Sequence, residues 1–545
     1  MSVAHELAER SGMGVDFDIH VYEARADTPG GKARSIPVPG TGTGGRSDLP
    51  GEHGFRFFPG FYRHLPDTMG RIPYPPGGWV VDNLVVADRL EIARFDRAPI
   101  VVASRFPRSL DDLIVNLEAL FGSHTGIEPG EVRFFAGKIW QILTSCAARR
   151  LVEYEKVTWW DFLEADNHSQ AYASLLVTGL SRSLLANDPV HASARTVGDT
   201  NIQLMLGAVE PGQSVDRLLN GPTSKVWLDP WFDYLQSLGV SYHFDAQAMR
   251  ILLNDAGVVG VELLQGGAPV VVCADAYVFA LPVERMADVI AAGDRTGVEN
   301  PLTVDPSLAN ILRLGGNVAW MNGIQFFLRD DVPIAAGHVL YADTPWSLTS
   351  ISAAQFWSQE PLTQTGDGTV RGVLSVCISK WDAPGIVYGL AAKDCTRAQI
   401  AAEVWAQLKR SVNVEGKTLL EDTNVHTVFL DPDIKDIVGA GVNYQDAEPL
   451  FVNFVDTWRL RPTATSSISN LFLASDYVQT NTDVACMEGA NEAARRAVNA
   501  LLAWSGSRAE PCEIWPLHEP VLLSPLRWRD QLRFDQGLPW DGALL

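Results

Sequence analysis

The sequence is short of basic side chains. Its 545 residues include 43 lysines and arginines against 65 aspartates and glutamates, which gives a formal net charge of −22. A surface of this sign repels the phosphates of nucleic acids and of anionic bilayers. Nucleic acid is therefore not an expected partner.

Long apolar runs and paired cysteines are also missing. No segment approaches the ~20 apolar residues that span a bilayer, and the first residues lack the basic and apolar regions of a signal peptide. Any membrane contact is thus expected to be peripheral. The six cysteines are scattered, without a C-x-x-C motif or a histidine at metal-ligand spacing. We therefore expect reduced thiols in a cytoplasmic protein, and no metal site.

The sequence also lacks the glycine-rich turn that the helix and strand patterns at its N-terminus would require. MSVAHELAER has the spacing of a helix, and FDIHVYE alternates like a strand that ends at Glu23. In a dinucleotide-binding unit, the acidic residue at such a strand end binds a ribose and lies ~20 residues after a G-x-G-x-x-G turn. Counting back from Glu23 puts that turn just before Met1. We expect the natural chain to begin roughly 25–30 residues upstream; the alternative is that it begins here and binds its cofactor weakly.

The length is that of two or more domains, because single hydrophobic cores stop growing near ~250–300 residues. Helical periodicity dominates from about residue 105 to 225. An example is SLDDLIVNLEALF, in which Ser109 and Asp112 have the spacing of a capping box.

Strand patterns return at 239–282, as an antiparallel excursion followed by a buried strand, and later in WMNGIQFFLR and VRGVLSVCISKW. No single compositional break separates these regions. This indicates domains built from interleaved segments.

The first of three polar clusters is GGKARS, seven residues after the acidic strand end. Gly30 and Gly31 would let backbone amides approach an anion, and Arg34 and Ser35 would supply donors for a pyrophosphate. Taken alone, a glycine pair beside a basic residue is a commonplace turn. Its position after the strand favours a dinucleotide-phosphate site.

The second cluster is GEHGFRFFPG (51–60). Glycines surround one acid, one imidazole, one guanidinium and several aromatic rings, as a planar conjugated ring would need. His53 is the group here suited to proton transfer near neutral pH. The alternative is a folded loop whose aromatic rings pack in the core.

The third cluster joins a buried strand that ends at Asp476 to a helix that starts at Met487. This arrangement brings a carboxylate and a helix N-terminus to one place. Gly489 and Ala490 are small enough for a ligand to lie against the helix.

Together, VYEA, GGKARS, GEHGFRFFPGFYRHLPDTM and NLFLASDYVQTN…MEGANEAARRAV resemble the flavin-containing amine oxidase and phytoene desaturase superfamily. The resemblance is greatest to bacterial FAD-dependent oxidoreductases of the carotenoid-desaturase and hydroxysqualene-dehydroxylase type. It extends from residue 1 to about 505 and implies FAD as the cofactor. It also implies an α/β fold, in which a doubly wound, Rossmann-like FAD-binding domain without its N-terminal strand is interleaved with an α+β substrate domain.

We expect the FAD-binding domain to comprise 1–104, 225–300 and 455–505, and the substrate domain to comprise 105–224 and 301–454. Residues 506–545 are expected to form an ordered extension docked on the body, because their aromatic side chains would otherwise be exposed.

Carried over to this sequence, the family's motifs assign residues to FAD. Glu23 would bind the adenosine ribose, and the backbone of Ala248 would pair with the adenine. Asp476, with Ser475 beside it, would hold the ribityl and pyrophosphate portion, and the amide of Met487 the flavin carbonyl. The pyrophosphate and the flavin edge would be lined by Gly30, Gly31, Lys32, Arg34 and Ser35, and the ring bordered by Phe55, Arg56 and Phe57.

Two departures from the family bear on function. A glycine usually stands at the position of Ser475, and we expect the added hydroxymethyl group to be tolerated. Amine oxidases usually carry a lysine on a strand of the substrate domain, and WMNGIQFFLR has none. This favours dehydrogenation or isomerisation over amine oxidation.

The favoured function is an FAD-dependent oxidoreductase of the dehydrogenase or desaturase type, with hydride transfer at flavin N5. Its substrate is expected to be a small, largely apolar molecule, with isoprenoids and polyenes as candidates. Such chemistry requires orientation and water exclusion from the protein. The catalytic candidates are His53, Arg56 and Trp458.

Two alternatives stay open. In a flavin amine oxidase, Trp458 would form one wall of an aromatic cage around the substrate nitrogen. In the other alternative, the protein is a binding or assembly subunit of the same fold that holds FAD poorly. The sequence leaves the substrate, the electron acceptor and the oligomeric state undetermined.

Overall fold

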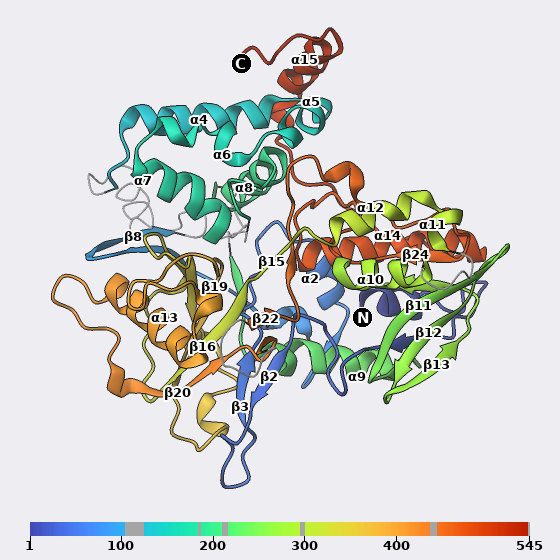
Figure 1. Cartoon of the computed structure of the whole chain (residues 1–545), viewed down its shortest axis with the longest axis horizontal. Coiled ribbons are helices and arrows are strands. Elements are labelled where there is room, and N and C mark those ends of the chain that lie inside the picture. Colours follow the sequence, from blue (N-terminus) through green and yellow to red (C-terminus); the bar gives the residue numbers. More distant parts are fainter. Residues whose placement is uncertain (104–124, 184–186, 210–215, 295–299, 437–443, 543–545) are drawn as a thin grey trace.

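The computed structural model describes residues 1–103, 125–183, 187–209, 216–294, 300–436 and 444–542. Three groups of elements are visible in Figure 1: an α/β region that contains the N-terminus, a large sheet with one long helix, and a helical layer that carries the C-terminal helix.

The α/β region contains two parallel strand pairs formed by segments far apart in the chain. The pairs are β1 (His20–Tyr22) with β10 (Ser241–His243) and β14 (Tyr277–Phe279) with β24 (Leu471–Leu473). The expected antiparallel excursion is confirmed as β11 (Ala246–Asn254), β12 (Gly257–Gln265) and β13 (Ala268–Val272). The helices of this region are α1 (Ser2–Ala8), α9 (Asp229–Ser237), α10 (Val283–Asp294), α11 (Pro301–Val304), α12 (Ala309–Leu314) and α14 (Met487–Ser505). The expected α/β fold is thus confirmed.

Two hydrophobic cores hold the α/β region together. In one, the fully buried Met286 of α10, Leu473 of β24 and Val498 of α14 pack in a single cluster. In the other, Ala4 of α1 and Trp231 of α9 pack in one cluster with Val21 of β1. Burying such side chains stabilises the fold by ~1.5–3 kcal/mol each, which ties the distant segments to one another.

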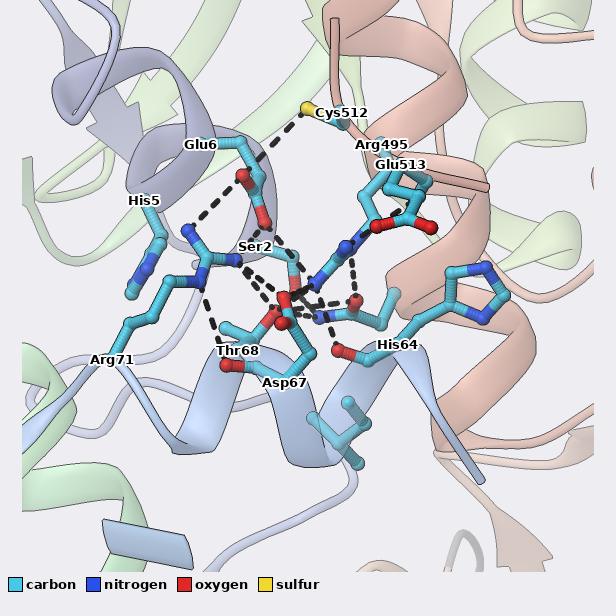
Figure 2. Close-up of polar contacts among 12 residues, drawn as sticks. Ser2, His5, Glu6, His64, Asp67, Thr68, Arg71, Arg495, Cys512 and Glu513 are labelled. Atoms are coloured by element: carbon cyan, nitrogen blue, oxygen red, sulfur yellow. Dashed lines mark hydrogen bonds and ion pairs between the residues drawn. The ribbon is translucent and has the colours of Figure 1, made fainter. Parts of the chain in front are cut away.

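A buried polar network anchors the N-terminal helix α1 (Figure 2). Glu6 is fully buried and pairs with Arg71, and Arg495 of α14 lies 3.5 Å from it. Glu6 also pairs with Arg10. Burial alone would raise the pKa of Glu6, but these guanidinium groups lower it to about 2. Arg495 also donates to the backbone oxygen of His64 in α2 (His64–Met69) at 2.9 Å. The predicted helix at the start of the chain is therefore fixed by charge as well as by packing.

The large sheet has seven strands in the order β20-β16-β19-β18-β17-β7-β8. Their bounds are β7 (Arg89–Arg94), β8 (Arg97–Ala103), β16 (Asn322–Leu328), β17 (Gly337–Tyr341), β18 (Leu348–Ser352), β19 (Gly372–Ile378) and β20 (Val425–Leu430). Helix α13 (Arg397–Val412) packs on it through the fully buried Ile400, Val404 and Leu408. The strands predicted in WMNGIQFFLR and VRGVLSVCISKW are confirmed as β16 and β19.

The sheet takes in two strands from segment 1–104, which we expect in the FAD-binding domain. β7 pairs in parallel with β17 and antiparallel with β8, so both strands belong to the large sheet. The motifs that set the boundary end before this hairpin, and hydrogen bonding to a strand far along the chain leaves no local pattern in the sequence.

The helical layer confirms the helical character expected after residue 105, in the part of that segment that the structure describes. It comprises α4 (Pro129–Thr144), α5 (Ala147–Val152), α6 (Trp159–Phe162), α7 (Gln170–Tyr172), the π-helical η4 (Ala173–Ser183) and α8 (Ala194–Val209). The helix predicted at 109–121, with Ser109 and Asp112, lies outside the described residues.

The C-terminal segment contacts the helical layer through an ion pair and a hydrogen bond. Asp530 of α15 (Ser524–Asp535) forms a buried ion pair with Arg149 of α5 at 3.0 Å. The indole of Trp540 donates to Thr144 at 3.1 Å. Trp528, in contrast, stays 67% exposed, so not every aromatic ring of the segment is covered.

Short strand pairs and turns connect these regions. They include β2 (Ser35–Val38) with β3 (Leu49–Glu52), β4 (Pro73–Tyr74) with β5 (Gly78–Trp79), β6 (Leu84–Val86) with β9 (Arg217–Leu219), β15 (Val318–Ala319) with β23 (Leu450–Phe451), and β21 (Ile434–Asp436) with β22 (Tyr444–Asp446). All six cysteines are free thiols. Over the described parts of the chain, no helix has the length and apolar character needed to span a bilayer.

Candidate active site

Glu23 directly follows β1, as the strand pattern predicts. Its Oε1 accepts from the Arg25 amide at 3.0 Å, and its backbone oxygen accepts from Ala246 at the start of β11. The amino group of Met1 is buried, which lowers its pKa, and it interacts electrostatically with Glu23. The first turn of α1 and the acidic strand end therefore meet. Ala248 lies on β11, partly buried against the core.

The glycine pair forms a tight turn near these groups. Gly30 and Gly31 have φ of +101° and +60°, a region that favours glycine. At Gly31, nothing lies within 4 Å of the place where a Cβ would stand, so this backbone borders open space. Arg34 pairs with Asp433, and the Lys32 ammonium donates to a backbone oxygen at Pro449. Both side chains thus have protein partners.

Glu52, the last residue of β3, and Arg56 of the loop that follows lie close together in a buried place. Glu52 Oε1 accepts from the Ser35 hydroxyl at 2.8 Å and from the Thr223 amide at 2.9 Å. Burial raises the pKa of Glu52, although the charge of Arg56 opposes this effect. Glu52 Oε2 and Arg56 Nε are buried without hydrogen-bond partners.

The aromatic side chains of the same loop contact a histidine that the sequence analysis did not single out. The rings of Phe55 and Phe57 pack against His338 of β17 with centroids 4.9 and 5.4 Å away. Burial lowers the pKa of His338 to about 3, and neither ring nitrogen has a partner. The only sequence signal was a single histidine in an otherwise apolar strand.

A cavity opens where the loop faces the large sheet. The space enclosed within it is about 30 Å³, and it opens to solvent. Its apolar lining consists of Phe55, Leu218, Leu219, Ile351, Ala353, Phe356 and Trp357, and its polar lining includes Glu52, Arg56, Thr223, Gln325 and Ser375. The second predicted cluster (51–60) lines the cavity. The first cluster supports it, because the Ser35 hydroxyl donates to Glu52.

The loop and the sheet touch backbone to backbone at the start of β16. The amide of Gly323 donates to the oxygen of His53 at 2.8 Å. A Cβ at Gly323 would lie 2.7 Å from that oxygen and 2.9 Å from Gly54 Cα. Only glycine allows this approach, so the position of the loop depends on it.

His53 itself contacts acidic groups that follow β20. Its Nδ1 lies 2.7 Å from Asp431 and 3.5 Å from Asp433. Burial works against a charged imidazole, but these two carboxylates outweigh it and raise the pKa of His53. The sequence analysis missed both carboxylates, although an acid directly after a strand was the signal used for Asp476.

The third predicted cluster lies beside the first. Met487 begins α14 and packs in the same hydrophobic cluster as Met1 and Ala33. Glu284 of α10 interacts electrostatically with both Lys32 and Asp476, and its buried Oε2 has no partner. The motifs at 23, 30–35 and 475–487 therefore converge.

Trp458 lies among arginine side chains and not in the cavity, where a cage wall would be expected. The guanidinium groups of Arg195 and Arg461 lie over its ring, 4.4 and 5.1 Å from the centroid. It does not line the cavity. A substrate ammonium would have to compete with these two cations for the ring, which argues against the cage.

Comparison with known proteins decides the family. The family model described as flavin containing amine oxidoreductase matches residues 1–502. The chain belongs to this family. A comparison with curated proteins finds no match.

Several solved structures have a similar fold. An oxidoreductase from Methanosarcina mazei has a TM-score of 0.56 at 11% identity, over 92% of this chain and 97% of that one. Putrescine oxidase bound to putrescine has the same TM-score and identity, over 92% and 96%. Cyclohexylamine oxidase from Brevibacterium oxydans reaches 0.57 at 12%, over 93% and 96%. At these identities the likeness concerns the fold alone.

FAD is the cofactor of this flavin-containing amine oxidoreductase, and the residues present fit it. Open space at Gly31, the unpartnered Glu284 oxygen and the convergence of three motifs form a polar cradle of the required kind. Glu23, the amides of the glycine turn, Asp476 and the start of α14 would hold the cofactor. When bound, FAD supplies the hydride acceptor.

The backbone conformation at Ser475 explains why this family usually has a glycine at this position. Its φ of +125° lies in a region that side-chain-bearing residues rarely adopt. The expected tolerance of the hydroxymethyl group therefore comes at a conformational cost.

We predict that Ser475→Gly raises the free energy of unfolding by about 1 kcal/mol, because relief of strain outweighs the added freedom of the unfolded chain. Denaturant titration with saturating FAD measures it. Ser475→Ala is the matched control, since it keeps the Cβ and should give no gain. An equal gain in both variants would assign the effect to the hydroxyl group instead.

Proposed function

We propose that the protein is a dehydrogenase- or desaturase-type FAD oxidoreductase that acts on a small, largely apolar substrate, with isoprenoid or polyene chains as candidates. The observation that carries this proposal is the cavity between the loop after β3 and the large sheet. The walls of this cavity are mostly apolar. An apolar wall positions a hydrocarbon and excludes water, which is what hydride transfer requires of the protein.

The polar groups of the cavity lie on the loop and on the sheet. Arg56 offers an unpartnered Nε donor and Glu52 an unpartnered Oε2 acceptor. Gln325 is held by the Glu52 amide, which donates to its Oε1 at 2.9 Å. These groups would orient one polar substituent, while Phe55 and Trp357 contact the apolar part.

β16 supports dehydrogenation over amine oxidation. Its polar side chains are Asn322 and Gln325, both fully buried and hydrogen-bonded, and the strand contains no lysine. Neither amide can titrate or carry charge.

Amine oxidation is the second candidate, favoured by the similarity in fold to putrescine oxidase and cyclohexylamine oxidase. Aromatic rings such as Phe356 and Trp357 could contact a substrate nitrogen. Arg56 in the same cavity weighs against this candidate, because a guanidinium repels an ammonium group.

Anaerobic reduction of the bound flavin separates the two candidates. FAD-loaded protein is mixed with panels of polyenes and of amines, and bleaching of the visible flavin band is followed. We expect bleaching by polyenes, slowed in Trp357→Ala and unchanged in Trp528→Ala, which alters an exposed indole on α15. Bleaching by amines alone would contradict the proposal.

A further inference from the structure

A buried polar cluster that the proposed function does not use lies next to the loop after β3. It contains His53, Asp431, Asp433, Asp446 and Asn322, which come from the loop, from the segment after β20, from β22 and from the start of β16. All five side chains are buried, and Asp431 and Asn322 are fully inaccessible.

The contacts of His53 are unusual for a hydrogen-bonded histidine. Its Nδ1 lies 2.7 Å from Asp431 Oδ2 and 3.5 Å from Asp433 Oδ2, yet makes no hydrogen bond of acceptable geometry. Two ligand atoms bound to one cation at ~2.1 Å and roughly at right angles stand ~3 Å apart. The distances from Nδ1 to the two carboxylates match those between ligands of one cation.

The cluster is rich in carboxylates. Asp431, Asp433, Asp446 and the adjacent Glu448 face the guanidinium groups of Arg25 and Arg34, and Arg56 interacts electrostatically with Asp431. With a neutral imidazole at His53, one negative charge stays uncompensated. Such a buried charge costs several kcal/mol, so the cluster requires either a proton on His53 or a bound cation.

The unpartnered atoms favour the cation. Asp446 Oδ2 and Asn322 Oδ1 are buried and lack partners. Asn322 Nδ2 lies 3.1 Å from Asp431 and 3.3 Å from Asp446, so the amide stands between the two carboxylates. A proton on His53 Nδ1 would add a donor that makes no hydrogen bond of acceptable geometry. A cation uses lone pairs that are present and adds no donor.

We propose that His53 Nδ1, Asp431 and Asp433 bind a divalent cation, with the negative charge of Asp446 held beside them through Asn322. One imidazole nitrogen with several oxygens suits Mn²⁺ or Fe²⁺ better than Mg²⁺, which prefers oxygen ligands alone. Arg34, paired with Asp433, fixes that carboxylate from the outside. The sequence analysis expected no metal site because it searched for closely spaced ligands, and these are distant along the chain.

The test uses FAD-loaded protein, analysed first for metals by mass spectrometry and then dialysed against chelator and titrated with Mn²⁺. Electron paramagnetic resonance of free Mn²⁺ reports binding. We expect one Mn²⁺ per chain and at least 10-fold weaker binding of Mg²⁺. Asp431→Asn and Asp446→Asn should each weaken Mn²⁺ binding, the former by ~100-fold.

Asp216→Asn is the matched control, because Asp216 is a buried carboxylate with two unpartnered oxygens outside the cluster. It should bind Mn²⁺ like the unaltered protein. Absence of stoichiometric metal and of Mn²⁺ binding in the unaltered protein would overturn the proposal in favour of a proton on His53, whether or not Asp431→Asn folds. Equal loss in Asp216→Asn would also overturn it. Neither result depends on the proposed substrate.

Discussion

Replacing Arg461 by methionine is expected to lower the free energy of unfolding by about 3–5 kcal/mol, because it removes one of the two cations that pair with a buried carboxylate and leaves several carbonyl groups without their donor. The side chain of Arg461 is fully buried and forms an ion pair with Asp483 at 2.9 Å. Its three nitrogens also donate to the backbone oxygens of Asp476, Tyr477, Val478 and Asp483.

The same substitution should weaken FAD binding. The carbonyl groups held by Arg461 belong to the segment that presents Asp476 to the cofactor site, so loss of the guanidinium frees that segment to move. Equilibrium denaturation with and without FAD, together with a fluorescence titration of FAD, measures both effects.

The control is Arg459→Met, two positions away. The side chain of Arg459 is 70% exposed and pairs only with Asp456 on the surface, an interaction worth at most ~1 kcal/mol. Arg461→Lys should also destabilise the protein, since an ammonium group cannot reach four carbonyl groups at once. Stability close to that of the unaltered protein in Arg461→Lys would show that charge, rather than this set of hydrogen bonds, is what matters.

The second large effect concerns pH. Burial lowers the pKa of His338 to about 3 in the folded protein, against a value of about 6.5 in the unfolded chain. Below pH 6.5 the unfolded chain therefore binds a proton that the folded protein does not, and stability falls with pH. Between pH 6.5 and 4 this histidine alone should cost about 3 kcal/mol.

His338→Leu should remove this acid-dependent loss and raise stability at pH 7 by about 1–3 kcal/mol, because two unpartnered buried nitrogens disappear. Denaturant titrations at pH 7 and pH 4 measure the change. His191→Leu, at a histidine with a 62% exposed side chain, should keep the pH dependence of the unaltered protein. An unchanged pH dependence in His338→Leu would show that the imidazole finds a partner in solution.

Local patterns in the sequence were sufficient for several parts of the cofactor site. The helix at the N-terminus, the strand before Glu23, the strand before Asp476 and the helix from Met487 all have the expected bounds within a few residues. Alternation and helical periodicity depend on neighbouring residues, and for that reason they can be read from one sequence. The family's motifs then related these elements to FAD.

The assignments of individual side chains were less complete. Lys32 and Arg34 were expected at the pyrophosphate, and the structure gives both of them protein partners. Trp458 was expected at the substrate, and the guanidinium groups of Arg195 and Arg461 lie over its ring. A sequence motif specifies which residue stands at a position, whereas burial and the nearest opposite charge determine where its side chain points.

The sequence by itself determined the family, the cofactor and the elements that carry the cofactor motifs. Only the tertiary structure decided that the 89–103 hairpin joins the large sheet, that Phe55 and Trp357 line one cavity, and that His53 meets Asp431. The physical reason is the same in each case. Strand pairing, cavity formation and the sharing of buried charge join residues that are hundreds of positions apart, and such contacts leave no periodic trace in a single chain.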